Sequence, residues 1–246
     1  MTSLKSDSGS TLKDTSVYDV IVVGAGFGGM YMLHELRKIG LNVLVLEEAT
    51  GVGGTWYWNR YPGARCDVES MEYSYSFSDE LQQEWNWSYR FSTQPEILEY
   101  ANHVADRFDL RKHIKFKTRV NSVSYESGEK KWLLRSTSGE EFQGRYCVMA
   151  TGTLSSVNEP KFSGLDEYKG DWYITGRWPH DGVDFSGKTV GIIGTGSSAV
   201  QAIPVIAKQA KHLTVFQRTA NYSIPAKNRP LSSFEIKDIK SRYSDI

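Results

Sequence analysis

Residues 19–29 read Asp-Val-Ile-Val-Val-Gly-Ala-Gly-Phe-Gly-Gly, and this stretch decides the fold. The β-branched run before the glycines is typical of a short strand that is buried on both faces. Gly24, Gly26 and Gly29 fit the pattern G-x-G-x-x-G. In this pattern the first glycine makes a tight turn, the second lets a pyrophosphate approach the backbone, and the third lets a helix pack on the strand. The stretch therefore predicts a strand, a phosphate-binding turn and the start of a helix.

The residues that follow complete a strand–helix–strand unit. Helical spacing runs over residues 30–39, Gly40 stops the helix, and residues 42–47 read as a second apolar strand. Its last residue, Glu47, lies 23 residues beyond Gly24. An acid about 20 residues after the first glycine hydrogen-bonds a ribose 2′-hydroxyl in dinucleotide-binding folds. We therefore predict a cofactor with a free adenosine ribose, such as FAD or NAD; a glycine-rich turn without a ligand is the alternative.

A second unit of the same kind occurs later in the chain. A strand over 189–193 leads into Gly194-Thr195-Gly196-Ser197-Ser198-Ala199, a G-x-G-x-x-A variant, and a helix over 200–210 and a strand over 212–216 follow. After that strand comes Arg218 rather than an acid. A guanidinium suits a 2′-phosphate and does not replace the acid's bond to a ribose hydroxyl. The second site is therefore predicted to bind NADP, unless Arg218 is a solvated charge at the strand end.

Two dinucleotide sites of opposite preference on one chain indicate electron transfer between their cofactors. We expect bound FAD and diffusible NADPH, with a hydride passing from nicotinamide to flavin. The corresponding fold class is α/β, with two Rossmann-like, doubly wound and mostly parallel segments in a three-layer arrangement.

Composition narrows the function classes. The chain has 246 residues, with 29 Lys and Arg against 29 Asp and Glu, so no basic field for nucleic acid is expected. No apolar run reaches the roughly 18–20 residues of a membrane helix. Two cysteines are too few for a secreted disulfide framework, which favours a reducing, cytoplasmic compartment, and the five histidines show no metal-ligand spacing. Residues 1–16 are polar and aperiodic and are predicted to be a disordered tail.

An aromatic loop lies between the two units. Residues 55–67 read Thr-Trp-Tyr-Trp-Asn-Arg-Tyr-Pro-Gly-Ala-Arg-Cys-Asp. The three consecutive aromatic residues, 56–58, are either core packing or a wall against a planar cofactor. Asp67 is either part of a surface ion pair with Arg65 or a carboxylate held near a flavin. The residue types leave both pairs of alternatives open.

This loop closely resembles the Baeyer–Villiger monooxygenases, FAD- and NADPH-dependent enzymes that insert an oxygen atom beside a ketone carbonyl. The resemblance runs from about residue 18 to 225 and is carried by three strings: residues 56–67, residues 92–98 (Ser-Thr-Gln-Pro-Glu-Ile-Leu) and residues 215–219 (Val-Phe-Gln-Arg-Thr). Within the family the chain is most similar to the phenylacetone and steroid branch. These strings are long, so they are more specific than either glycine motif. The resemblance implies a small-molecule ketone and O2 as reactants, and an ester or lactone formed through a flavin peroxide.

The resemblance also assigns residues to the two cofactors. Glu47 would hold the FAD ribose, and Asp67 would act in catalysis by orienting an arginine near the flavin. The flavin would be lined by Thr55, Trp56, Tyr57, Trp58, Asp67, Val68, Tyr73 and Val120, with Arg65, Cys66 and Asp67 also near the nicotinamide end. NADP would be held by Gly194, Thr195, Gly196, Ser197, Ser198, Ala199, Val200 and Gln201, together with Arg218 and Thr219.

Two features depart from the family. Its linker fingerprint, F-x-G-x-x-x-H-x-x-x-W-P, corresponds here to residues 168–179, where the glycine and the Trp178-Pro179 ending fit but Ile174 replaces the histidine. Isoleucine makes no side-chain hydrogen bond, so we expect impaired coupling more than lost cofactor binding. Family members also continue well beyond residue 246, so the second Rossmann-like segment is expected to be incomplete and the catalytic arginine to lie outside this chain.

The predicted organisation is a tail over residues 1–16, an FAD-binding domain over 17–152, a linker over 153–187 and a partial NADP-binding domain over 188–246. Two other functions stay open. A flavin monooxygenase that oxidises amine nitrogen or sulfide sulfur shares both glycine motifs but lacks the Trp-Pro ending of the linker motif. A non-catalytic nucleotide-binding fragment is favoured by the early C-terminus and by Ile174. The residues do not indicate the oligomeric state.

Overall fold

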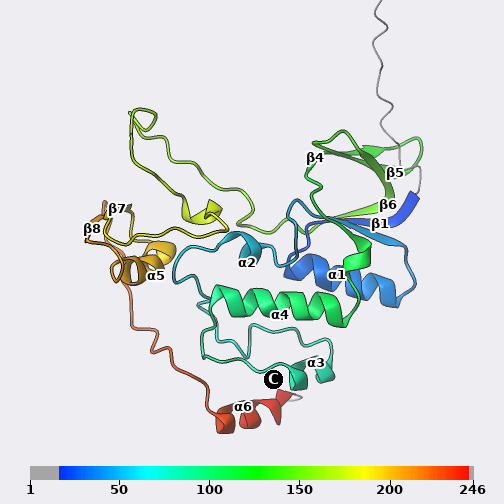
Figure 1. The fold of residues 1–246 in the computed structure, drawn as a ribbon. Coiled ribbons are helices and arrows are strands. Elements are labelled where there is room, and N and C mark those ends of the chain that lie inside the picture. The colour runs from blue at the N-terminus through cyan, green and yellow to red at the C-terminus, as the bar shows by residue number, and fades with distance from the viewer. Residues whose placement is uncertain (1–16, 244–246) are drawn as a thin grey trace, which may run out of the picture. The chain divides into compact units, whose positions relative to one another are not determined.

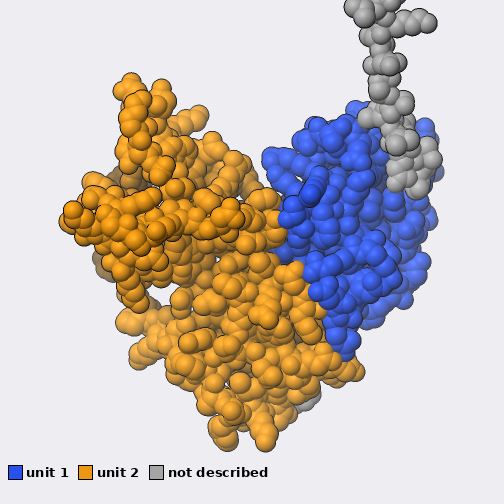
Figure 2. Space-filling model, in the orientation of Figure 1, with its two compact units in different colours: residues 1–54, 105–153 blue, residues 55–104, 154–246 orange. Residues whose placement is uncertain are grey.

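The structure, a computed structural model, describes residues 17–243, so the predicted tail over residues 1–16 lies outside the described residues. The chain divides into two compact units, which Figure 2 shows in different colours. Unit 1 comprises residues 1–54 and 105–153, and unit 2 comprises residues 55–104 and 154–246. Each unit is therefore assembled from two separate stretches of the chain.

Unit 1 is built on a six-stranded sheet with the order β3-β2-β1-β6-β5-β4 (Figure 1). Its strands are β1 (Val17–Val23), β2 (Val43–Leu46), β3 (Ile114–Lys115), β4 (Val120–Glu126), β5 (Lys131–Ser136) and β6 (Glu141–Met149). Strands β3, β2, β1 and β6 are parallel, and β4 and β5 add an antiparallel extension. Strand β6 belongs to both the parallel and the antiparallel part of the sheet, because its residues 141–144 pair with β5 and its residues 143–149 pair with β1. This parallel-rich sheet confirms the predicted α/β class.

The strand that leads into the first glycine motif is buried on both faces, as its β-branched run predicts. Ile21 and Val22 are adjacent in β1 and therefore point to opposite faces of the sheet, yet both are 0% exposed. The helix that follows, α1 (Phe27–Lys38), buries Leu33 completely. On the Ile21 face the core cluster also contains Leu46, Leu134 and Phe142. Burial on both faces explains why this strand has no polar alternation.

Unit 2 contains a two-stranded parallel sheet and most of the helices. Strand β7 (Thr189–Ile193) pairs with β8 (His212–Phe216), and α5 (Ser197–Ile206) connects them. Ile193 is 67% exposed and Phe216 55% exposed, so this sheet buries less of its apolar surface than the first. The other α-helices of unit 2 are α2 (Thr55–Trp58), α3 (Asp79–Glu84), α4 (Gln94–Arg107) and α6 (Ser233–Lys240), although the last three residues of α4 belong to unit 1. Of the two 3-10 turns, η1 (Arg111–His113) lies in unit 1 and η2 (Thr175–Arg177) lies in unit 2.

The structure moves several predicted boundaries. The helix predicted over residues 200–210 runs from Ser197 to Ile206, because Gly196 is already its N-cap. The helix predicted over residues 30–39 runs from Phe27 to Lys38, and the strand predicted over residues 42–47 runs from Val43 to Leu46. The short helices α2 and α3 have no periodic signal long enough to predict. Among residues 17–243, none of the helices combines the length and the apolar character that a membrane span needs.

Candidate functional site

The first glycine turn lies in unit 1 between β1 and α1, and the backbone geometry requires two of its glycines. Gly24 has φ +107°, a left-handed conformation, and a Cβ there would lie 2.5 Å from the carbonyl oxygen of Ala150. A Cβ on Gly29 would lie 1.9 Å from the carbonyl oxygen of Gly24. The first glycine therefore permits the turn beside the end of β6, and the third permits the close approach of α1 to the turn.

The second glycine of this turn begins the helix. Gly26 is the N-cap of α1, no side chain caps this end, and the first turn of the helix carries no acidic residue. Backbone N–H groups and the helix dipole make such an end suitable for an anion. A Cβ on Gly26 would meet Gly54 at 3.5 Å, so the two glycines let a second loop pass close to the turn. This end of α1 has the properties of a phosphate site.

The carboxylate of Glu47 is directed at this turn. Glu47 follows β2 and is 5% exposed. Its Oε2 accepts a hydrogen bond from the backbone N–H of Ala25 at 2.6 Å, and its Oε1 accepts one from the N–H of Ala49 at 2.7 Å. A carboxylate has about four acceptor positions, so both oxygens retain capacity for a hydroxyl donor. The structure therefore places the predicted ribose-binding acid at the first glycine turn.

Replacing Glu47 by glutamine should lower the free energy of unfolding by about 1–3 kcal/mol, because one amide NH2 would then face a backbone N–H of Ala25 or Ala49. Urea denaturation measures the loss. The matched control is Glu48→Gln, which removes an exposed ion pair with Arg119 and should cost about 1 kcal/mol or less. Equal losses for the two variants would contradict a structural role for the buried carboxylate.

The second glycine turn lies in unit 2 and repeats the backbone of the first. Gly194 has φ +102°, and Gly196, the N-cap of α5, has φ −72° and ψ −178° against −75° and −172° for Gly26. No side chain caps α5. Among the described residues, no heavy atom lies within 4 Å of a Cβ built on Gly194 or Gly196. No described residue therefore crowds Gly194 in the way that the backbone of Ala150 crowds Gly24 in the first turn.

The predicted 2′-phosphate ligands lie after β8. Arg218 and Thr219 are exposed, and Arg218 forms no ion pair or hydrogen bond with any residue between 17 and 243. Thr195, in the turn itself, accepts hydrogen bonds at Oγ1 from Gln217 (2.8 Å) and Asn221 (3.1 Å). The guanidinium of Arg218 is thus available to an external anion.

The aromatic residues of α2 pack within unit 2. Trp56 is 8% exposed and donates a hydrogen bond from Nε1 to the hydroxyl of Tyr73 at 3.0 Å. Tyr57 is 9% exposed, and its ring contacts the ring of Trp58, with the two centroids 5.0 Å apart. The guanidinium of Arg60 lies over the same Tyr57 ring, 5.0 Å from its centroid. Packing therefore accounts for much of this aromatic run, and the wall against a cofactor stays a prediction.

Gln201 binds the Arg65 loop, and its role as a nucleotide ligand stays a prediction. Its Oε1 accepts hydrogen bonds from the Tyr61 hydroxyl (2.8 Å) and from the N–H of Arg65 (3.2 Å), and its Nε2 donates to the carbonyl of Arg65 (3.1 Å). A Cβ on Gly63 would lie 2.3 Å from the backbone oxygen of Gln201. Helix α5 thus lies against the Pro62-Gly63 turn, and Gln201 is joined to the stretch that ends in Asp67. The Pro62-Gly63 pair predicts a turn, but no pattern in the sequence predicts that Tyr61 and Gly63 contact Gln201 of α5.

Replacing Gln201 by methionine should free the Arg65 loop while preserving side-chain length. Three hydrogen bonds are lost and the N–H of Arg65 loses its acceptor, so amide exchange in a peptide covering residues 63–67 should accelerate at least about tenfold. Hydrogen–deuterium exchange mass spectrometry measures it. Gln209→Met, at an exposed glutamine beyond α5, is the control and should leave that peptide unchanged. Unaltered exchange in the Gln201 variant would show that the loop is held by other contacts.

The remaining predicted residues are divided between the units. In unit 2, Cys66 is buried, and burial raises the pKa of its thiol; burial also raises the pKa of the Tyr73 hydroxyl. Asp67 and Val68 are exposed. In unit 1, Val120 begins β4 and packs against the Ile21 core cluster. Glu47 and Val120 therefore belong to unit 1, and the residues predicted at Thr55–Tyr73 belong to unit 2.

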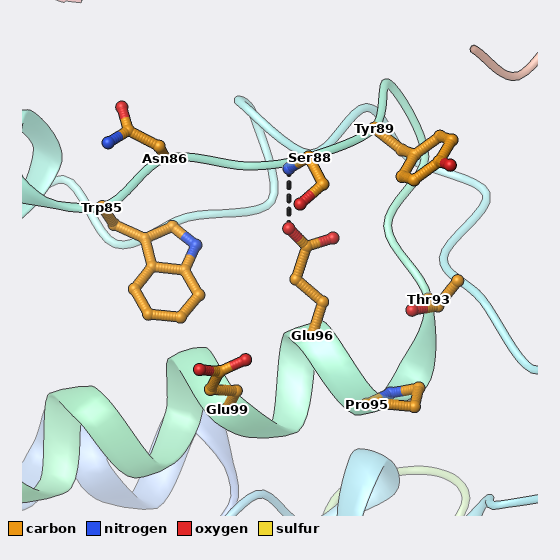
Figure 3. A pocket seen from close by; sticks show the side chains of 8 residues that line it. All are labelled: Trp85, Asn86, Ser88, Tyr89, Thr93, Pro95, Glu96 and Glu99. Carbon is orange, nitrogen blue, oxygen red and sulfur yellow. Dashed lines mark hydrogen bonds between the residues drawn. The ribbon is translucent and has the colours of Figure 1, made fainter. Parts of the chain in front are cut away.

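A surface pocket of about 540 Å³ lies in unit 2, outside the predicted residues (Figure 3). It is bounded by Trp85 and Tyr89 from the α3–α4 loop and by Glu96 and Glu99 from the first turns of α4. The N–H of Ser88 donates to Glu96 Oε1 at 2.6 Å and so ties the loop to the helix. Within residues 17–243 no group of three His, Cys, Asp or Glu side chains is arranged to hold a metal ion.

Comparison with known proteins places these two turns in a family. Residues 21–242 match the family model described as pyridine nucleotide-disulphide oxidoreductase. The chain belongs to this family. Among curated relatives of the chain, a Baeyer–Villiger monooxygenase of Pseudooceanicola batsensis is 50% identical over 93% of the chain and 42% of the relative. Phenazine N-monooxygenase PhzNO1 of Lysobacter antibioticus is 45% identical over 95% of the chain and 43% of the relative.

Solved structures agree with the sequence relatives. The chain superposes on an oxidised steroid monooxygenase bound to NADP with a TM-score of 0.90 and 58% identity, covering 94% of this chain and 44% of that one. The resemblance to Baeyer–Villiger monooxygenases, and to their steroid branch, is therefore confirmed. The chain spans less than half the length of the relatives it matches.

The stretch that corresponds to the linker fingerprint, residues 168–179, lies in unit 2. Trp178 is 7% exposed and shares a core with Tyr61, Phe185 and residues of α5. Ile174, which stands in place of the fingerprint histidine, precedes η2. Its backbone carbonyl accepts a hydrogen bond from the N–H of Arg177 at 3.0 Å. His180 lies against Tyr57, with centroids 5.1 Å apart, and burial lowers its pKa. Sequence reasoning assigns His180 no role, because no local pattern links it to the aromatic loop.

Proposed function

We propose that this chain is the FAD- and NADPH-binding part of a Baeyer–Villiger monooxygenase, an enzyme that inserts one oxygen atom of O2 beside a ketone carbonyl to form an ester or lactone. The observation that carries the proposal is the pair of glycine turns with one backbone conformation and opposite charges after the following strand. Glu47 follows β2, and Arg218 follows β8. Identity of 50% to a Baeyer–Villiger monooxygenase over 93% of the chain supports the reaction type.

The residues present fit the two cofactors. At the first turn, an uncapped helix N-terminus and a buried carboxylate directed at the turn suit a pyrophosphate and a ribose hydroxyl. At the second, Gly194 and Gly196 leave room that a Cβ would otherwise fill, and the next strand is followed by a guanidinium that pairs with no residue between 17 and 243. These donor sets differ in charge, so each turn selects its own dinucleotide.

Each group then has a task. Glu47 holds the adenosine ribose of FAD, and the N-terminus of α1 holds its phosphates. The N-terminus of α5 holds the phosphates of NADPH, while Arg218 and Thr219 hold its 2′-phosphate. The flavin, when bound, supplies hydride acceptance and oxygen activation. Asp67, exposed at the end of the loop that Gln201 anchors, orients a cation beside the reaction centre.

The proposed domain organisation and cellular location follow from the assignment of FAD to the first turn and NADPH to the second. Residues 17–152 form the FAD-binding domain, residues 153–187 the linker, and residues 188–246 part of the NADP-binding domain. The ketone is a small molecule, and neither nucleic acid nor a membrane is needed as a partner. The two cysteines, Cys66 and Cys147, are both free thiols, which favours a reducing, cytoplasmic compartment.

Colour and reduction test the redox pair. The purified 246-residue chain, supplied with FAD and desalted, should be yellow, and anaerobic NADPH should bleach it. Aerobic incubation of the whole enzyme, of which this chain is the proposed part, with a panel of ketones, followed by mass spectrometry, then tests for esters or lactones. A chain that stays colourless would point to a non-catalytic nucleotide-binding fragment, and a whole flavoprotein that yields no ester from any ketone would contradict the Baeyer–Villiger reaction.

The second candidate is oxidation of nitrogen. It is favoured by the 45% identity to a phenazine N-monooxygenase over 95% of the chain. The buried Trp178 and the following Pro179 belong to the Baeyer–Villiger form of the linker motif and favour the first candidate. Competing a ketone against a phenazine in one reaction separates the two, since a predominant N-oxide would select the second.

A further inference from the structure

Two of the strings that carry the family resemblance, the aromatic loop and residues 92–98, pair with each other in unit 2. The N–H of Cys66 donates to the carbonyl of Ser92 at 3.1 Å. Next to this hydrogen bond, Arg65 and Thr93 form an antiparallel bridge. The end of the aromatic loop is therefore paired with the stretch that leads into α4.

The pairing resumes after Asp67, where the N–H of Ser70 donates to the carbonyl of Arg90 at 2.7 Å. Residues 67–69 lie between the paired residues on this side, and a single residue lies between them on the other side. The extra residues form a bulge in the pairing, which we call the Asp67 bulge. Cys66 and Ser70, at its two ends, are buried, whereas Asp67 is exposed. The bulge thus presents a carboxylate between two buried anchors.

The hydroxyl of Ser70, a residue that is 2% exposed, fixes the second anchor. Its Oγ lies 2.7 Å from the carbonyl oxygen of Tyr89, 2.7 Å from the hydroxyl of Ser92 and 2.9 Å from the backbone nitrogen of Ser92. The carbonyl of Arg90, at 3.0 Å, already accepts from the Ser70 N–H. Because a carbonyl only accepts, the single hydroxyl proton of Ser70 goes to Tyr89, and Ser70 accepts from both donors of Ser92. These three hydrogen bonds use the full capacity of the hydroxyl.

We propose that Ser70 is a positioning residue whose hydroxyl holds the Asp67 bulge in the conformation that the reaction needs. The inference rests on the proposed function, in which Asp67 orients a cation beside the reaction centre. The side chain of Asp67 forms no hydrogen bond or ion pair with any residue between 17 and 243. The direction of this carboxylate therefore depends on the backbone of the bulge, and that backbone is held at its end by Ser70.

The first measurement follows the bulge by hydrogen–deuterium exchange mass spectrometry of the full chain. Ser70→Ala removes the acceptor that the structure gives to the N–H of Ser92, so exchange in a peptide covering residues 66–70 should accelerate at least about tenfold. Ser92→Ala should accelerate it less than about threefold, because Ser70 keeps its bonds to the Tyr89 carbonyl and to the Ser92 N–H. Unaltered exchange in Ser70→Ala would overturn the inference.

Ser136 provides the matched control in unit 1. It is 3% exposed, and its hydroxyl accepts from the N–H of Glu140 at 3.1 Å. Ser136→Ala therefore removes a buried hydroxyl with the same kind of backbone contact, and both alanine variants should lower the melting temperature by about 2–6 °C. Exchange in the peptide covering residues 66–70 should stay unchanged in Ser136→Ala. An equal acceleration there would overturn the inference, because general destabilisation would then account for it.

The second measurement separates positioning from a purely structural role in the whole enzyme, of which this chain is the proposed part. Ser70→Ala should lower kcat for ketone oxidation about tenfold and leave KM for NADPH within about twofold, because the bulge is not part of the NADPH turn. In a variant that already carries Asp67→Ala, adding Ser70→Ala should lower kcat by no more than about twofold further. Losses that multiply in the double variant would overturn the inference.

Failure of the proposed function gives a different pattern. A whole enzyme that forms no ester from any ketone, or that keeps its full kcat in Asp67→Ala, contradicts the proposed role of Asp67. Hydrogen–deuterium exchange needs neither cofactor nor substrate, so it still decides whether Ser70 anchors the bulge. Accelerated exchange confined to Ser70→Ala, together with a loss of kcat that disappears in the Asp67→Ala background, supports the assignment of Ser70.

Discussion

Replacing Gly29 by alanine should destroy the first dinucleotide turn. The new Cβ would lie 1.9 Å from the carbonyl oxygen of Gly24. The oxygen belongs to the backbone and the backbone also fixes the position of the Cβ, so neither a rotamer change nor a small shift relieves the contact. Overpacking of this severity should lower the free energy of unfolding by about 3 kcal/mol or more. Thermal unfolding followed by circular dichroism measures the loss, and desalting followed by flavin absorbance measures retention of added FAD, which should be lost as well.

The adjacent glycine provides the matched control. No heavy atom of the described residues lies within 4 Å of a Cβ on Gly28, which is exposed on α1. Gly28→Ala should therefore leave FAD retention intact and raise stability by up to about 1 kcal/mol, because alanine favours the helix. A Gly29 variant that unfolds at the same temperature as the original chain would refute the close packing of α1 on its turn.

Replacing Arg218 by alanine should weaken NADP⁺ binding about 100-fold and change NAD⁺ binding less than threefold. The guanidinium is exposed and forms no ion pair or hydrogen bond with residues 17–243, so its removal costs little folding energy and removes a charge-assisted bond to the 2′-phosphate. Calorimetric titration with the two nucleotides measures the difference. The ratio of the two dissociation constants is the decisive quantity, because a damaged turn would weaken both nucleotides together.

Lys208→Ala serves as the control for this substitution. Lys208 is an exposed cation just beyond the end of α5, away from the turn at its N-terminus. Its removal lowers the net charge by the same amount and should alter neither dissociation constant more than threefold. Equal losses of NADP⁺ and NAD⁺ in the Arg218 variant would show that the guanidinium does not recognise the 2′-phosphate.

Local patterns predicted the regular elements of both units. The run before Gly24 forms β1, the helical spacing after it forms α1, and the strand ending near Glu47 forms β2. These elements depend on propensity, burial on both faces and a left-handed glycine, which neighbouring residues decide. Strand β6 also depends on tertiary pairing, because its residues 141–144 pair with β5 and its residues 143–149 pair with β1.

The candidate site was predictable only in part. The glycines and Glu47 lie together because one strand–turn–helix unit contains them. The resemblance assigned Gln201 to the nucleotide, and the structure adds that its side chain binds the backbone of Arg65. That contact joins residues 136 positions apart, and no periodicity or motif reports on such a distance.

The sequence by itself determined that this chain builds two strand–turn–helix nucleotide units, and that an acid follows the second strand of one unit whereas a cation lies two residues after the second strand of the other, because these are local features. The tertiary structure alone decided which segments the side chains contact. The amide of Gln217 reaches Thr195 in the second turn, and helix packing directs Gln201 to Arg65, since hydrogen bonds between distant segments form only after the strands and helices have assembled.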